Sequence, residues 1–73
     1  RIGSKTVICQ DVIIGPHSVV GNNCLIDDNV LIGRDCRIGN KVKIESRTKI
    51  KQNTKIGDET IIGKFFLTKD INN

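Results

Sequence analysis

Aliphatic residues recur at every sixth position along the whole chain. In the series that starts at Ile2, eleven of the twelve members are Ile or Val, and no insertion interrupts the register. A period of six is neither the period of an α-helix nor the simple alternation of a long strand. It indicates short strands joined by tight corners, with one strand in each hexapeptide. The series is Ile2, Ile8, Ile14, Val20, Ile26, Ile32, Ile38, Ile44, Ile50, Ile56, Ile62 and Thr68.

A second series of small or β-branched residues follows the aliphatic series four places later, as at Ser18, Cys24 and Cys36. Residues two apart in a strand face the same side, so the small residue and the next aliphatic both point inward. Three hexapeptides close one triangular coil, and residues eighteen apart stack on each other. The pattern therefore predicts an all-β fold: a parallel β-helix of about four triangular coils, three hexapeptides each, in a single domain over residues 1–73.

The corners between the predicted strands carry glycine, asparagine and aspartate. Gly3, Gly21, Gly39 and Gly57 form one column at eighteen-residue spacing. We expect a corner there that is too tight for a Cβ atom, or a backbone φ that is positive. Asparagine and aspartate suit left-handed corner conformations. These corner residues are Asn22, Asn23, Asp28, Asn29, Asn40, Asn53 and Asp58.

The outward strand position changes character along the chain. Its members are Val7, Ile13, Val19, Leu25 and Leu31, then Arg37, Lys43, Lys49 and Lys55, and finally Ile61 and Leu67. The aliphatic half predicts a contact surface, because contiguous exposed apolar patches commonly mark one. The alternative is that strands simply tolerate exposed aliphatic residues. The basic residues fall on all three faces without interleaved aromatics, so we expect no nucleic-acid partner.

The composition changes this picture little. The net charge of +4 permits an acidic ligand without indicating one. Three cysteines without C-x-x-C spacing indicate reduced thiols and a cytoplasmic protein; Cys24 and Cys36 are expected inside and Cys9 at an outward corner. No apolar run has transmembrane length, and no signal peptide is evident, so we expect no membrane insertion. Because the sequence opens on Arg1, we expect it to be part of a longer chain.

The whole chain resembles the hexapeptide-repeat family, whose motif is an aliphatic residue, then Gly or an acid, any two residues, a small residue and any one. The resemblance implies left-handed coils and a homotrimer packed side by side. It also implies acyl transfer from acetyl-CoA or an acyl carrier protein to a sugar nucleotide or similar small acceptor. The alternative is a non-catalytic structural or regulatory β-helix, such as those attached to sugar nucleotidyltransferases, or a truncated or designed scaffold.

The resemblance also suggests site residues. His17 is the only histidine and falls on an outward corner, where an enzyme of this family places its general base; the alternative is an ordinary surface histidine. Arg34 stands where related sugar acyltransferases carry that histidine, and an arginine cannot act as a base. Whether the chain is an enzyme therefore stays open.

The end of the chain resembles the last coil of sugar acetyltransferases, which helps to bind coenzyme A. This comparison makes Lys64, Thr68 and Lys69 candidate cofactor-binding residues. No metal site is expected, because the related γ-class carbonic anhydrases need three histidine ligands and this chain has one.

Overall fold

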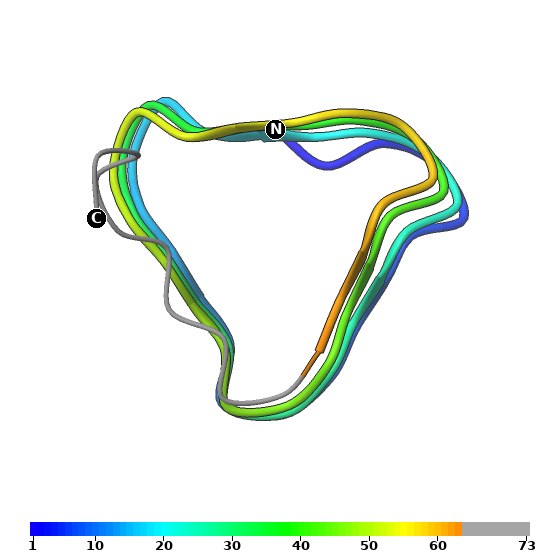
Figure 1. Ribbon diagram of the computed structural model, residues 1–73, viewed down its shortest axis with the longest axis horizontal. Helices are drawn as coiled ribbons and strands as arrows, with labels where there is room; N and C mark the ends of the chain where they lie inside the picture. The colour runs from blue at the N-terminus through cyan, green and yellow to red at the C-terminus, as the bar shows by residue number, and fades with distance from the viewer. Residues whose placement is uncertain (64–73) are drawn as a thin grey trace.

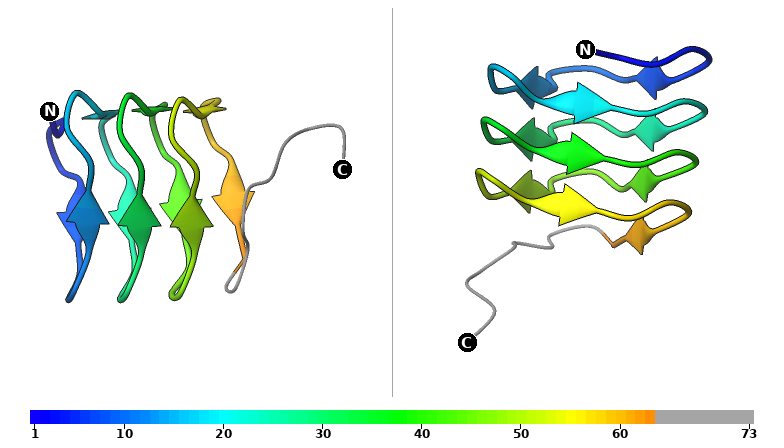
Figure 2. Two further views of the ribbon diagram at one scale, coloured as in Figure 1. Left: turned by 90° about the vertical axis from the view of Figure 1, so that its left-hand side faces the viewer. Right: turned by 90° about the horizontal axis from the view of Figure 1, so that it is seen from above.

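The computed structural model describes residues 1–63, which form a parallel β-helix of about three turns. Viewed along the helix, the coils superpose on a triangular outline (Figure 1), and from the side they stack in layers (Figure 2). The strands are β1 (Val7–Ile8), β2 (Ile13–Ile14), β3 (Val19–Val20), β4 (Leu25–Ile26), β5 (Leu31–Ile32), β6 (Arg37–Ile38), β7 (Lys43–Ile44), β8 (Lys49–Ile50), β9 (Lys55–Ile56) and β10 (Ile61–Ile62). The predicted fold class is confirmed; the last predicted coil extends beyond the described residues.

Each side of the triangle is a parallel sheet made from every third strand. The orders are β1-β4-β7-β10, β2-β5-β8 and β3-β6-β9. The register is eighteen residues throughout, so that Ile32 pairs with Ile14 on one side and with Ile50 on the other. The stacking columns predicted from the sequence are therefore the columns of the structure.

The core consists of the aliphatic and small residues of each hexapeptide. Outward residues lie between them, which gives the strands their alternation of exposed and buried positions. The buried apolar residues are Val20, Cys24, Ile26, Val30, Ile32, Cys36, Ile38, Val42, Ile44, Ile50, Ile56 and Ile62. Burial of these side chains is the main stabilising term for so short a chain.

Polar small residues inside the prism bridge one coil to the next. Each donates a hydrogen bond to the backbone carbonyl fifteen residues later, in the following coil. The pairs are Thr6 to Gly21 (2.6 Å), Ser18 to Gly33 (2.7 Å), Cys24 to Gly39 (3.1 Å), Cys36 to Lys51 (3.2 Å) and Thr48 to Gly63 (3.2 Å). Within residues 1–63, no buried side-chain nitrogen or oxygen lacks a partner. Serine, threonine and cysteine share this position because each is small and can donate a hydrogen bond to a backbone carbonyl of the next coil.

The predicted positive φ of the glycine column is wrong, whereas the predicted tight corner is confirmed. None of the described glycines has a positive φ. A Cβ atom on Gly21 would lie 2.5 Å from the carbonyl oxygen of Gly39 and 2.7 Å from its carbon. Glycine is needed because adjacent coils approach closely there.

Positive φ values occur instead at a different corner position, which recurs every six residues. Asn23, Asn29 and Asn53 occupy it, as predicted, but so do Lys5 and Arg47. The remaining predicted corner residues have another role: their side chains accept hydrogen bonds from backbone N–H groups of the preceding coil. These bonds join Asn22 to Ser4 (2.9 Å), Asp28 to Gln10 (3.0 Å), Asn40 to Asn22 (2.9 Å) and Asp58 to Asn40 (2.8 Å).

Candidate functional site

His17 lies on an exposed corner, as the sequence predicts, and takes a left-handed backbone conformation with φ 63°. The following coil places Asp35 in the same corner column, since the Asp35 N–H donates to the Pro16 carbonyl at 3.0 Å. The Asp35 carboxylate is engaged by Arg34 and not by the imidazole. Among the described residues, His17 therefore has no carboxylate partner that would orient it as a general base.

Arg34 is also on the surface. Its Nε lies 3.1 Å from Oδ2 of Asp35, and the two side chains are 56% and 44% exposed. An exposed pair of this kind contributes little to stability. The guanidinium offers charge at this corner but no proton acceptor, so the position assigned by resemblance to a catalytic base holds none.

The three candidate cofactor-binding residues, Lys64, Thr68 and Lys69, lie outside the described residues. The predicted use of acetyl-CoA or an acyl carrier protein consequently remains a prediction from sequence.

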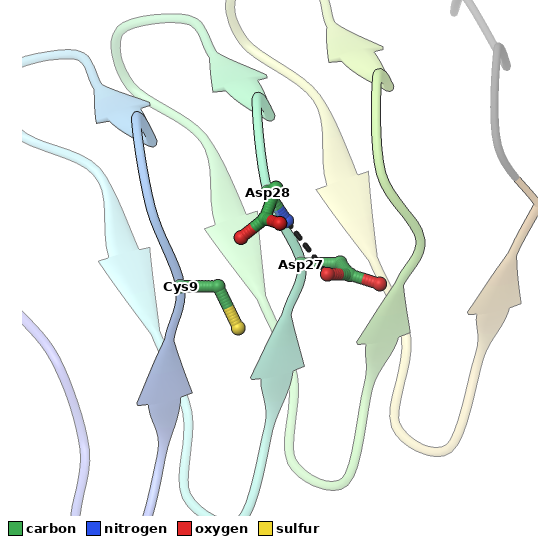
Figure 3. A group of neighbouring side chains, drawn as sticks. All are labelled: Cys9, Asp27 and Asp28. Atoms are coloured by element: carbon green, nitrogen blue, oxygen red, sulfur yellow. Dashed lines mark hydrogen bonds between the residues drawn. The ribbon is translucent and has the colours of Figure 1, made fainter.

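The structure brings together a group that the sequence analysis missed. Cys9 follows β1, and Asp27 and Asp28 follow β4 in the next coil (Figure 3). One ligand atom from each of the three side chains lies within 4.8 Å of the other two. The signal in the sequence was the eighteen-residue spacing of Cys9 and Asp27, which stacks them at one corner.

Hydrogen bonds hold the two carboxylates of this group in place. Oδ1 of Asp27 accepts the Asp28 N–H at 2.8 Å, and Oδ1 of Asp28 accepts the Gln10 N–H at 3.0 Å. Partial removal from water raises the pKa of the Cys9 thiol above its ordinary 9.0, and the charges of Asp27 and Asp28 raise it further. Cys9 is thus a protonated thiol near neutral pH, beside two carboxylates.

We call the outward aliphatic residues of the first coils the N-terminal apolar face, which extends over all three sides of the prism: Val7, Ile13, Val19, Leu25 and Leu31. Val7 is 55% exposed and Ile13 is 63% exposed. Pairing of β1 with β4 and of β2 with β5 stacks four of these side chains in two adjacent sheets. Farther along each sheet the outward position becomes basic, as in the pairs of Leu25 with Lys43 and of Leu31 with Lys49. The predicted change from apolar to basic is confirmed.

The triangular coils and the unbroken register define a hexapeptide-repeat β-helix domain. The model of the GMPPB C-terminal domain family matches residues 2–70, and the chain belongs to that family. This is a left-handed β-helix domain associated with nucleotidyltransferases, which supports the predicted handedness. No curated protein matches the chain significantly.

The family match bears on the activity expected from sequence. It gives no support to acyltransferase activity, and it agrees in part with the alternative of a nucleotidyltransferase-associated β-helix. Residues 1–63 contain no helix long and apolar enough to cross a bilayer.

Proposed function

We propose that this chain is the non-catalytic β-helical domain of a sugar nucleotidyltransferase and that it holds copies of the enzyme together. The observation that carries the proposal is the family match over residues 2–70. The surface chemistry supports it, since His17 has no carboxylate partner among residues 1–63 and Arg34 cannot act as a base.

The N-terminal apolar face is the contact surface that this role requires. Exposed aliphatic side chains on neighbouring strands gain free energy when a partner removes them from water. A second copy of this chain is the partner that we propose. In the trimer typical of hexapeptide-repeat proteins, the side that carries Val7 and Leu25 would contact the side that carries Ile13 and Leu31 on the neighbouring copy.

The test uses the full-length protein and changes one outward side chain. Ile13→Lys places a charge on the N-terminal apolar face at a position that is 63% exposed, so the core is untouched. We expect sedimentation to show loss of the oligomer at concentrations at which the parent is fully assembled. Ile61→Lys is the matched control, because Ile61 is 69% exposed and lies outside that face.

The two parts of the proposal fail separately. An oligomer that survives Ile13→Lys unchanged would refute the assembly role of this face. A full-length protein that forms no nucleotide sugar from nucleoside triphosphates and sugar phosphates would refute the nucleotidyltransferase assignment, whatever its oligomeric state.

A further inference from the structure

One corner of the prism differs chemically from the other two. At the position directly after the aliphatic residue, the first two described coils carry glycine at two corners, as at Gly21 and Gly33, whereas the corner after β1 and β4 carries Cys9 and Asp27. Asp28 follows Asp27 and adds a second carboxylate. Only this corner, within residues 1–63, gathers three side chains that ligate metals.

The geometry of the corner suits one small ion. The sulfur of Cys9 and one oxygen from each aspartate lie within 4.8 Å of one another. Zinc bonds to sulfur and carboxylate oxygen are about 2.0–2.3 Å long, which sets the ligand atoms roughly 3–4 Å apart. Figure 3 shows the three side chains on adjacent coils. The Cys9 side chain is accessible to solvent and would have to rotate to close the remaining distance, because hydrogen bonds already engage both carboxylates.

The backbone holds the two carboxylates in position before any ion arrives. The hydrogen bonds from the Gln10 and Asp28 N–H groups occupy Oδ1 of Asp28 and Oδ1 of Asp27. Each hydrogen bond fixes one carboxylate through its Oδ1 atom and leaves its Oδ2 atom available to a metal ion. Ordered hydrogen bonds behind the ligands of a metal commonly orient them in this way.

We propose that Cys9, Asp27 and Asp28 bind a divalent cation of the zinc class and thereby fasten the first coil to the second. A thiolate and two carboxylates form a donor set that such borderline-soft ions accept, and water would complete the coordination. On binding, the Cys9 thiol gives its proton to solvent and its sulfur bonds to the metal. Because the folded corner gathers the ligands, the ion stabilises the fold.

The experiment is a titration of the metal-free full-length protein with Cd²⁺, followed through the ultraviolet charge-transfer band of the thiolate–metal bond. We expect one saturating equivalent per chain, competition by Zn²⁺, and a rise in the thermal midpoint. Cys9→Ser should abolish the band. Asp28→Asn should weaken binding by more than the roughly tenfold that loss of a partner behind a ligand typically costs. The amide oxygen of the substituted side chain could still accept the Gln10 N–H, as Asn22 accepts the Ser4 N–H and Asn40 accepts the Asn22 N–H.

Two controls separate a site from general attraction of cations to acids. Asp58→Asn alters a carboxylate that accepts the Asn40 N–H in the same manner as Asp28 accepts Gln10, but at another corner. Glu45→Gln removes the acid that lies one coil beyond Asp27 in the same column. Both variants should bind Cd²⁺ like the parent. A band that survives Cys9→Ser, or equal weakening by Asp28→Asn and Asp58→Asn, would overturn the proposal.

Discussion

Single residues at the corners have three different physical roles, which the sequence pattern does not distinguish. Gly21 is required by the close approach of Gly39, and Asn23 adopts a left-handed backbone with φ 59°. Asn22, one residue earlier, accepts a backbone hydrogen bond from the coil above. Composition predicted that these positions are special, but glycine and asparagine each suit several corner conformations. The role of each residue becomes clear only from its backbone conformation and from its contacts with the neighbouring coil.

Cys9 offers a prediction at the scale of one thiol. Because partial desolvation and the charges of Asp27 and Asp28 raise its pKa above 9.0, alkylation by iodoacetamide should reach half its maximal rate at a higher pH than in a model thiol. The measurement is the pH profile of Cys9 labelling, with a chelator present and labelled peptides identified by mass spectrometry.

Substitution of Asp27 or Asp28 tests whether their charges raise the pKa of Cys9. Asp27→Asn and Asp28→Asn should each move the labelling midpoint to lower pH, without restoring it fully, because desolvation is the larger cause. Asp11→Asn serves as the control at a corner acid that does not contribute to the pKa of Cys9. A midpoint that stays in place when either Asp27 or Asp28 is neutralised would contradict the electrostatic explanation. Because folding raises the pKa of Cys9, the contribution of this thiol to the free energy of unfolding declines as the pH rises from its unfolded-state pKa through its folded-state pKa.

At the scale of one strand, the hexapeptide register determines which side chain is buried and which is exposed. Two-residue strands are too short for independent stability, so each depends on the coils above and below. The register was predictable because the period is unbroken and leaves only one inward assignment. The coil-to-coil hydrogen bonds of Cys24 and Cys36 were not predictable, because packing alone explains a small buried residue equally well.

Strand β5 provides a matched pair for testing the register. Ile32 is fully buried between Ile14 and Ile50, whereas its neighbour Leu31 is 40% exposed. Ile32→Asp places an unpaired carboxylate in the core and should abolish cooperative folding, while Leu31→Asp should leave it intact. Thermal unfolding followed by circular dichroism compares the two. A transition for Ile32→Asp close to that of the parent would show that the register is wrong.

For the whole molecule, the fold was predictable from one sequence while the site was not. Stacking every eighteenth residue follows from the six-residue period together with the glycine column at eighteen-residue spacing, and it holds for each described sheet. Function depends instead on how side chains meet at corners. The prism sets Cys9 beside Asp27 and Asp28, yet no carboxylate among residues 1–63 orients the exposed His17. Fold class therefore indicated a superfamily of acyltransferases, whereas the family match indicates an association with nucleotidyltransferases.

The whole chain should lack efficient acyl transfer to sugars. Loss of general-base catalysis costs about a hundred- to ten-thousand-fold in rate. His17 has no orienting carboxylate within residues 1–63, and Arg34 cannot replace it as a base. In a thiol-release assay with acetyl-CoA and a panel of amino and hydroxy sugars, the parent and His17→Ala should therefore give the same background rate. Robust turnover that disappears in His17→Ala would contradict this expectation and identify His17 as the general base of an acyltransferase.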